Sequence, residues 1–492
     1  MPAVHLYSLH FGYTSAVDVL DDLTMSFGAG WHGLVGENGS GKTTLLRLIL
    51  GELSPSQGRV VLDPADAVIA GCPQTVDDLT AQIRDFAASW DSENAARRSR
   101  LDLDAENDLS RWGSLSPGER RRWQLAAALA AGPDILCIDE PTNHLDSFAN
   151  DLLIEELTRF RGVGVIVSHD RRLLDRLTTS TIRLVGGAAQ LWGGSYSTAS
   201  VEWRNREAEA VERRERLRKE RNRIKSRLDE RRRNAEATAR RDRDQRRKAS
   251  SADANTRSMT LKKRQESAQS TGSRAIGVDA QHLERIDQRL DASRVRRRRG
   301  DPISIASGPP SRRVLLSHRG PLRAGQTLLK ENLTVDIGGD TRLRVSGPNG
   351  SGKSTLLAAL VDEATIDPLR ILWLPQELSH HERAGLIERL RDLRGEEIGR
   401  VMSIAARLGL DPGRVLKSDE PSPGEARKLW LAEGLGKEVW VAILDEPTNH
   451  LDLASVERLE SALAEYAGAL IFVSHDETFL RGGPDFEEIE LG

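Results

Sequence analysis

The feature that most constrains this chain is an internal repeat. Five short segments, GENGSGKTTLL, CPQ, SPGE, DEPTNHLD and VSHD, occur in this order at 36–170 and return as GPNGSGKSTLL, LPQ, SPGE, DEPTNHLD and VSHD at 347–476. The last three pairs share one offset of 306 residues, so no net insertion distinguishes the two copies across that stretch. In a chain of 492 residues, such a repeat predicts two duplicated domains instead of a single hydrophobic core.

Each copy has the pattern of an α/β domain. Short apolar runs, such as ILCI at 135–138 and LIFV at 470–473, alternate with helical stretches. Continuous apolar runs of this length are typical of strands that are buried on both faces of a parallel sheet. We therefore predict the α/β class, with a parallel sheet in each copy.

The segment between the copies has a different composition. Residues 201–300 contain 32 Lys and Arg but 17 Asp and Glu, although the whole chain has a net charge of −3. Arg, Glu and Ala dominate 201–248 and favour a helix. The sparse apolar residues at helical spacing are Val211, Leu217, Ile224 and Leu228 in a first series and Leu283, Ile286 and Leu290 in a second. These features predict a long, charged α-helical hairpin.

This hairpin divides the chain into three predicted domains. They are a first α/β domain at 1–198, a basic helical linker at 199–303 and a second α/β domain at 304–492. A polar stretch rich in Ser and Thr, at about 250–275, lies midway between the two apolar series and is the predicted tip. Met259 and Leu261 are its sizeable apolar residues, which could contact a partner or pack the turn.

Composition excludes several classes of protein. No run approaches the ~18 apolar residues that a membrane helix needs, and the N-terminus lacks the basic and apolar regions of a secretory signal. The chain has two cysteines, Cys72 and Cys137, without neighbours at metal-ligand spacing, so neither a disulfide framework nor a zinc site is expected. We expect a cytoplasmic protein that does not cross a membrane.

The first repeated segment has the spacing of a P-loop, between a predicted strand at 31–35 and a helical run. Backbone N–H groups of such a loop surround phosphate oxygens at the positive end of the following helix. A structural Gly-rich turn is the alternative reading of one isolated match, and the second match in the same context argues against it. The predicted nucleotide-binding residues are Gly36, Asn38, Gly39, Ser40, Gly41, Lys42, Thr43 and Thr44 in the first copy, and Gly347, Asn349, Gly350, Ser351, Gly352, Lys353, Ser354 and Thr355 in the second.

Within each loop, two side chains have specific expected roles. Lys42 would reach the terminal phosphates and Thr43 would ligate Mg²⁺, with Lys353 and Ser354 in the same roles in the second copy. Both loops therefore predict binding of ATP together with Mg²⁺.

A predicted buried strand ends in two carboxylates in each copy, Asp139 with Glu140 and Asp445 with Glu446. Neighbouring side chains of a strand point to opposite sides, so the two acids can have different tasks. We expect the aspartate to hold Mg²⁺ through water and the glutamate to orient or deprotonate the attacking water. Acidic pairs also cap helices, but their recurrence beside a P-loop in both copies favours catalysis.

Two further side chains recur beside these motifs. His169 and His475 each follow an apolar strand and a serine, a position from which the imidazole could contact a γ-phosphate, although a solvated loop histidine is the default for one such residue. Gln74 and Gln376 follow a short strand, and we expect them to contact Mg²⁺ or water.

The ordered series of P-loop, Gln, SPGE, DE, NHLD and His resembles the nucleotide-binding domain of ATP-binding cassette (ABC) proteins, present twice. The resemblance implies that the two cassettes pair head to tail within one chain, with each ATP held between the P-loop of one cassette and the signature of the other. The signature residues so implied are Ser116, Gly118 and Glu119, facing the second P-loop, and Ser422, Gly424 and Glu425, facing the first.

The chain departs from the family pattern at three points. Both signatures carry proline where the family has glycine, and Pro421 replaces the usual leucine before the second signature. Proline is tolerated in the first turn of a helix, so phosphate recognition is expected at both. Tyr13, 29 residues before Lys42, resembles the aromatic residue that stacks on adenine, and no aromatic residue matches it before the second P-loop. We therefore expect two unequal ATP sites.

Two features resemble the ABC-F subfamily of twin-cassette ATPases. They are the string EPTNHLD, present twice, and GGSYS at 193–197, directly before the charged linker. The resemblance implies a ribosomal partner, with residues 199–303 reaching large-subunit ribosomal RNA and tRNA near the tRNA exit site and pointing toward the peptidyl-transferase centre. Lys and Arg side chains suit such a partner because they release counterions from RNA. The alternatives are a solvated spacer and, for the whole chain, the ATPase subunit of a separate permease.

The length of the first cassette favours one group within the subfamily. Housekeeping members often carry an extra arm between the glutamine and the signature, whereas Gln74 to Ser116 spans 42 residues here, against 46 for Gln376 to Ser422. The absence of an arm and the long linker resemble the antibiotic-resistance members, which protect ribosomes. We expect this role for the chain, without an obligate permease, and a general translation factor is the alternative.

Overall fold

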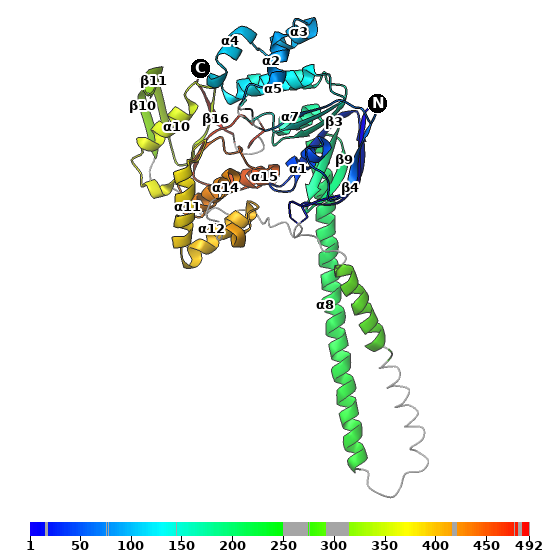
Figure 1. Ribbon diagram of the computed structural model, residues 1–492. Coiled ribbons are helices and arrows are strands. Elements are labelled where there is room, and N and C mark those ends of the chain that lie inside the picture. The colour runs from blue at the N-terminus through cyan, green and yellow to red at the C-terminus, as the bar shows by residue number, and fades with distance from the viewer. Residues whose placement is uncertain are drawn as a thin grey trace. The chain divides into compact units, whose positions relative to one another are not determined.

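The computed structural model describes residues 1–14, 18–74, 76, 78–143, 145–248, 274, 276–291, 314–415, 421–476, 478–480 and 485–491 (Figure 1). The chain forms two compact units. The first comprises Met1–Ala199 together with Arg299–Gly492 and contains both copies of the repeat, and the second comprises Ser200–Arg298. Each unit is considered by itself below.

The first copy is built on a six-stranded sheet with the strand order β5-β6-β7-β3-β8-β9. Neighbouring strands are parallel except for β9, which pairs antiparallel with β8. The strands are β3 (Gly30–Gly36), β5 (Ile69–Cys72), β6 (Ile135–Asp139), β7 (Val163–Val167), β8 (Ser180–Val185) and β9 (Ala188–Gly193). A separate antiparallel sheet has the order β2-β1-β4, with β1 (Ala3–Phe11), β2 (Leu20–Gly28) and β4 (Gln57–Asp63).

Helices connect these strands and cover the sheet. The helices of the first copy are α1 (Lys42–Ile49), α2 (Ala81–Ala88), α3 (Ser92–Arg100), α4 (Ala105–Ser110), the 3₁₀ turn η1 (Trp112–Ser114), α5 (Pro117–Ala130), α6 (Ser147–Leu157) and α7 (Arg171–Leu177). Aspartate side chains begin several of them, since Asp91, Asp146 and Asp170 accept a hydrogen bond from a backbone N–H in the first turn of α3, α6 and α7.

The second copy repeats this plan with a five-stranded parallel sheet in the order β13-β14-β15-β12-β16. Its strands are β12 (Arg342–Ser346), β13 (Ile371–Leu374), β14 (Val441–Asp445), β15 (Ala469–Val473) and β16 (Glu487–Glu490), and a hairpin of β10 (Leu316–Ala324) and β11 (Thr327–Ile337) precedes them. Its helices are α10 (Lys353–Asp362), η2 (Pro368–Arg370), α11 (His380–Asp392), α12 (Gly395–Arg407), α13 (Pro412–Val415), α14 (Pro423–Leu435) and α15 (Leu453–Ala464).

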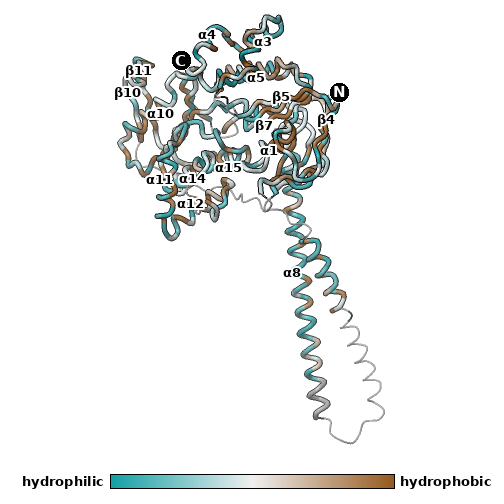
Figure 2. The backbone as a smooth tube through the Cα atoms, viewed as in Figure 1, coloured by the Kyte–Doolittle hydropathy of each residue, from teal (hydrophilic) through white to brown (hydrophobic). Residues whose placement is uncertain are grey.

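The apolar runs of the sequence lie where the periodicity predicts. All residues of β6, β7, β14 and β15 are buried, as expected for central strands with helices on both faces. Figure 2 shows the resulting concentration of apolar residues at β5 and β7 of the first copy. The α/β class and the duplicated cassettes are therefore confirmed.

The second unit is a pair of helices that lie side by side (Figure 1). Helix α8 (Tyr196–Lys248) has 53 residues, begins within the first unit and continues through the second. It packs against a helix at 276–291 through Ile224, Leu228 and Ile286, all buried. Figure 2 shows that α8 is otherwise largely hydrophilic.

Ion pairs also connect the two helices, beside these buried apolar residues. Arg231 Nη1 lies 2.7 Å from Oδ2 of the buried Asp279, and Arg221 Nε lies 2.5 Å from Oδ1 of Asp287. The predicted apolar series therefore packs only in part, since Val211 is 47% exposed. The predicted tip at 250–275, with Met259 and Leu261, lies almost entirely outside the described residues.

No helix among the described residues is long and apolar enough to cross a bilayer.

Candidate functional site

The first P-loop connects β3 to α1, as its spacing predicts. Gly41 precedes α1 with a φ of 98°, and Gly39 has a φ of 77°, a backbone region that favours glycine. The ammonium of the buried Lys42 folds back over the loop, where Nζ donates to the carbonyl oxygens of Gly36 at 2.8 Å and Glu37 at 3.2 Å. The loop therefore surrounds a cation with its own carbonyl groups, at the N-terminus of a helix.

The second P-loop has the same geometry between β12 and α10. Gly352 has a φ of 98°, and Lys353 Nζ donates to Gly347 at 2.8 Å and to Pro348 at 2.9 Å. Two loops of different sequence thus adopt one conformation, because the glycines and the lysine recur at the same spacing.

Each loop contains a buried hydroxyl group that a phosphate could satisfy. The hydroxyl oxygens of Ser40 and Ser351 are buried and have no hydrogen-bond partner among the described residues. A buried polar atom without a partner is costly, and a phosphate oxygen in the loop would provide one. The residues present therefore fit a nucleotide phosphate at both sites.

A hydroxyl and a carboxylate meet beside each loop. Thr43 Oγ1, at the start of α1, donates to Asp139 Oδ2 at the end of β6 over 2.7 Å. In the second copy, burial raises the pKa of Asp445, and the hydrogen-bonding hydroxyl of Ser354 offsets part of this rise. Oxygen atoms of this kind are the ligands that Mg²⁺ prefers, so both pairs fit that ion.

The two glutamines do not join these pairs. Gln74 and Gln376 are exposed, and neither side chain forms a hydrogen bond in the described part of the chain. Gln376 contributes its backbone carbonyl, which accepts from Arg427 Nη1 at 2.9 Å.

Glu140 and Glu446 follow β6 and β14 in a strained backbone conformation, with φ of 50° and 48°. Non-glycine residues seldom adopt a positive φ, and such strain concentrates at functional sites. Each carboxylate accepts the backbone N–H of the histidine 29 residues later, His169 or His475, at 3.2 Å. The structure therefore brings the predicted glutamate and histidine of each copy together.

The environment of these side chains suits proton transfer. Burial raises the pKa of Glu140 to about 7 despite the nearby ammonium of Lys42, and burial also raises the pKa of Glu446. Burial, with Lys42, lowers the pKa of His169 to about 3, so this imidazole is neutral at physiological pH. Its Nε2 lies 3.1 Å from Glu140 Oε1, and the same atoms of His475 and Glu446 are 3.4 Å apart. A carboxyl group with a pKa near neutrality is a suitable general base.

The two signatures lie at the N-termini of α5 and α14. Ser116 and Ser422 are the N-caps of α5 and α14, each in a capping box with the glutamate three residues later, and the following proline occupies the first helical turn. Glu119 and Glu425 thus bond to the backbone N–H of their own serine, at 2.7 Å and 3.0 Å. The prolines are accommodated without loss of a helical hydrogen bond.

The second signature lies against the first P-loop. A Cβ added at Gly424 would be 3.3 Å from Nδ2 of Asn38 and 2.8 Å from the carbonyl oxygen of His450, so glycine permits this close approach. Asn38 Nδ2 donates to the His450 carbonyl at 3.1 Å, and the backbone N–H of Asn38 donates to Asp452 Oδ2 at 3.3 Å. The first site therefore contains residues of both cassettes.

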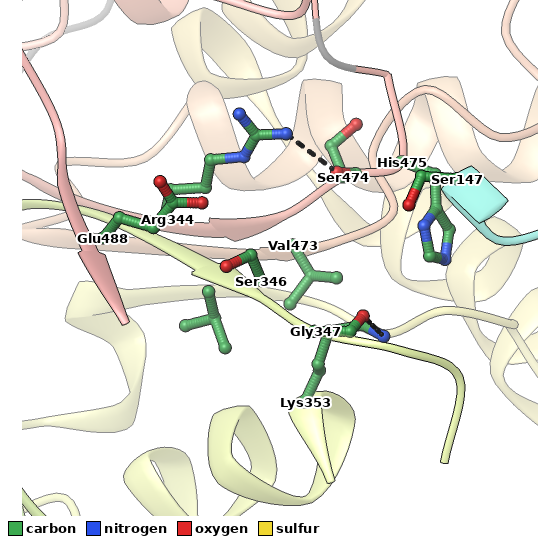
Figure 3. A pocket seen from close by; sticks show the side chains of 10 residues that line it. Ser147, Arg344, Ser346, Gly347, Lys353, Val473, Ser474, His475 and Glu488 are labelled. Atoms are coloured by element: carbon green, nitrogen blue, oxygen red, sulfur yellow. Dashed lines mark hydrogen bonds between the residues drawn. The ribbon is translucent and has the colours of Figure 1, made fainter. Parts of the chain in front are cut away.

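The second site is a pocket of about 310 Å³ (Figure 3). Lys353, Ser474 and His475 line it, together with Ser147 from the first copy. The first signature is not joined to it, because no hydrogen bond or ion pair connects Ser116–Glu119 with the second P-loop among the described residues. The two sites are thus closed to different degrees.

Tyr13 lies where an adenine ring could stack. Its ring is 61% exposed, its hydroxyl is 3.1 Å from Thr44 Oγ1, and its edge packs on Phe11 with ring centroids 5.0 Å apart. The contact with Thr44 fixes the ring beside the first turn of α1.

Two buried arginines were not predicted from the sequence. Arg427 donates to the carbonyl oxygens of Gln376 and Asp445, at 2.9 Å and 2.6 Å, and Arg121 donates to those of Pro73 and Asp139. Arg121 therefore connects the end of β5 with the end of β6, and Arg427 connects the end of β13 with the end of β14. The signal in the sequence was an arginine repeated at the offset of 306 residues, within a segment rich in arginine.

The fold and the two composite sites define a twin-cassette nucleotide-binding protein, and comparison with known proteins agrees. The ABC transporter family model matches residues 20–143 and 330–449. The tylosin resistance ATP-binding protein TlrC of Streptomyces fradiae is 32% identical over 556 residues, covering 95% of this chain and 94% of TlrC. The ribosome protection protein VmlR of Bacillus subtilis (strain 168) is 29% identical over 459 residues, covering 91% of this chain and 79% of VmlR.

Among solved structures, the RNase-L inhibitor has a TM-score of 0.61 at 18% sequence identity, covering 96% of this chain and 85% of its own, and it supports the fold. The chain belongs to the ABC-F subfamily of ATP-binding cassette proteins. It is accordingly an ATP hydrolase with two cassettes.

Proposed function

We propose that this ATPase binds the ribosome near the tRNA exit site and uses closure of its cassettes to insert the linker toward the peptidyl-transferase centre, thereby protecting the ribosome from an antibiotic. The observation that carries the proposal is similarity over nearly the whole chain to TlrC, named for tylosin resistance, and to VmlR, named for ribosome protection. The protein would act in the cytoplasm as a monomer, without a permease.

The charge of the second unit supports an RNA partner. Arg232, Arg233, Arg240 and Arg241 are exposed on α8, in a segment where basic residues outnumber acidic ones. Basic side chains at a phosphate backbone release condensed counterions, which strengthens binding at low salt. The proposed division is a first cassette at 1–198, an RNA-binding linker at 199–303 and a second cassette at 304–492.

In each cassette we assign the following roles. Lys42 and Lys353 hold the terminal phosphates, and Glu140 and Glu446 orient and deprotonate the attacking water. Thr43 with Asp139, and Ser354 with Asp445, would hold Mg²⁺, which neutralises the phosphate charge when it is bound. His169, whose imidazole is neutral, and His475 would contact the γ-phosphate.

Contacts at the N-terminus of α8 support a mechanical link between the second cassette and the linker. Tyr196, the first residue of α8, donates from its hydroxyl to Glu457 Oε1 at 2.8 Å, and Glu457 lies on α15. On the same helix, Glu460 Oε2 accepts from Arg171 Nη2 at 2.8 Å, and Arg171 begins α7 just after His169. Because α15 contacts both Arg171, two residues after His169, and the start of α8, movement of this helix would reach the linker.

Expression of the chain in a susceptible host tests the resistance role. We expect a higher inhibitory concentration for at least one drug among macrolides, lincosamides, streptogramins, pleuromutilins and phenicols, and no increase with the Lys42→Ala/Lys353→Ala variant. Co-sedimentation of both proteins with ribosomes in the presence of ATP tests the partner. Ribosome binding without any change in inhibitory concentration would favour a general translation factor, and copurification with a membrane protein instead of ribosomes would favour a permease subunit.

A further inference from the structure

A buried ion pair joins two elements of the second cassette. Lys428, on α14, places Nζ 2.6 Å from Oδ2 of Asp452, which precedes α15. The two residues are only 4% and 2% exposed. Removing two charges from water is expensive, so such a pair adds little net stability compared with apolar residues. A role in holding another group would account for it.

The carboxylate of Asp452 connects three elements. Oδ1 caps α15, where it accepts from the backbone N–H and the hydroxyl of Ser455 at 2.9 Å and 2.8 Å. Oδ2 accepts from Lys428 and also from the backbone N–H of Asn38, which belongs to the first P-loop. One carboxylate therefore links the signature helix and α15 of the second cassette with the phosphate-binding loop of the first.

This position also places a negative charge beside a loop that would hold phosphate groups. Burial lowers the pKa of Lys42, and the nearby charge of Asp452 is among those that oppose this shift. An uncompensated carboxylate here would repel an incoming triphosphate, and in a buried environment this repulsion is weakly screened. Lys428 neutralises the carboxylate and holds it on the Asn38 N–H.

The first cassette has different contacts at the equivalent positions. Arg122, at the offset of 306 residues from Lys428, donates from Nη1 to the carbonyl oxygens of Leu101 at 2.7 Å and Asp102 at 3.2 Å. Asp146, the counterpart of Asp452, caps α6 through the N–H of Ala149 at 2.9 Å. Among the described residues, no ion pair joins Arg122 to Asp146.

We propose that Lys428 is a positioning residue of the first ATP site, which acts through Asp452 by holding this carboxylate, neutralised, against the first P-loop. In the part of the chain that the structure describes, the second site has no equivalent ion pair, so Lys428 makes the two sites unequal. The inference rests on the proposed assignment of residues 36–43 as an ATP site, and it is independent of any ribosomal role.

The test is Lys428→Met in the full chain, with each site measured separately. Lys353→Ala disables the second site so that the first can be measured alone, and Lys42→Ala does the reverse. Titration with mant-ATP and Mg²⁺ then reports the affinity of the remaining site. We expect Lys428→Met to weaken first-site binding at least tenfold, about 1.4 kcal/mol, and second-site binding less than about twofold. Adding Asp452→Asn should restore first-site affinity to within about threefold of the wild-type value, because the repelling charge is gone.

Arg122→Met is the matched control, and it should leave first-site affinity unchanged. Equal loss at both sites, no loss at the first site, or no recovery on adding Asp452→Asn would each overturn the role of Lys428. If Lys428→Met alone does not fold, the test uses the uncharged Lys428→Met/Asp452→Asn variant instead. First-site affinity near the wild-type value would then support the inference, and a tenfold loss would overturn it. If the Lys353→Ala chain with no other change bound no mant-ATP, the assignment of the first site would itself be wrong.

Discussion

Glu140 and Glu446 are the side chains on which hydrolysis is expected to depend. Glutamine has nearly the same shape but cannot accept a proton from water, and the P-loop is untouched by this change. Glu140→Gln/Glu446→Gln should therefore bind ATP like the wild-type protein and lose turnover by about 10²- to 10⁴-fold. Phosphate release and mant-ATP binding, measured on the same preparation, check both expectations.

The control for this variant is the same change at exposed glutamates. Glu155 and Glu465 lie on the surface near the ends of α6 and α15, so Glu155→Gln/Glu465→Gln should keep full turnover. Hydrolysis at the wild-type rate by the Glu140→Gln/Glu446→Gln protein would show that the catalytic assignment is wrong.

Tyr13 is expected to matter at one site only. Its ring stands beside the first P-loop through the contact with Thr44, and no aromatic residue matches it before the second loop. Tyr13→Ala should weaken ATP binding at the first site by about 1 to 3 kcal/mol, the range for a base stacked on an aromatic side chain. Tyr13→Phe keeps the ring and should retain most of the affinity. The measurement is mant-ATP titration with each site isolated, and equal losses at both sites would contradict a stacking role.

The residues of each site that follow one another in the chain could be predicted from local patterns. The head-to-tail pairing of the cassettes was implied only by the resemblance to the ABC family, and the individual contacts across it could not be predicted. The glycine and lysine spacing determines the loop conformation, and the apolar run at 135–138 locates Asp139 at the end of β6. The positive φ that sets Glu140 apart was not predicted, because the alternation of a strand ends at Asp139. The contact of Asn38 with Asp452 joins residues 414 positions apart, and it depends on how two folded domains pack. No local pattern carries that information.

At the scale of elements, the hairpin shows the same division. The composition predicts a long charged helix, and α8 is one, but only Ile224 and Leu228 of its apolar series are fully buried against the second helix. Arginine and aspartate pairs such as Arg231 with Asp279 complete the packing. In a sequence with so many charged residues, the pattern does not show which arginines pair within the hairpin and which remain exposed.

This distinction gives a sharper test of RNA binding by the hairpin. Replacing the exposed Arg232, Arg233 and Arg240 with glutamine should weaken ribosome association and reduce its dependence on salt, by up to about one unit of slope for each phosphate that is no longer neutralised. Arg231→Gln is the matched control, because Arg231 is already engaged with Asp279. Co-sedimentation with ribosomes across a salt series is the measurement, and ATPase activity without ribosomes should be unchanged in both variants. Indifference of binding to the triple change would leave the hairpin as a spacer.

At the scale of the whole molecule, the duplicated cassettes are similar in plan and different in detail. Tyr13 and the pair of Lys428 with Asp452 belong to the first site, whereas the second site is an open pocket with Ser147 at its edge. Glu460 of α15, which contacts Arg171, also belongs to the second cassette alone, since Ile154 occupies the corresponding position of the first. A chain with this asymmetry need not use its two ATP molecules for the same step.

The last prediction separates ribosome binding from drug protection. The predicted tip lies almost entirely outside the described residues, and its expected role comes from its position in the sequence, midway between the two helices of the hairpin. Deleting residues 256–266 keeps α8, the helix at 276–291 and both ATP sites, so ribosome co-sedimentation and ATPase activity should persist while the rise in inhibitory concentration is lost. Met259→Ala removes one apolar side chain and should reduce protection less. If the shortened chain still protects its host, the contacts that displace the drug lie along the helices, and the exposed arginines of α8 become the residues to examine.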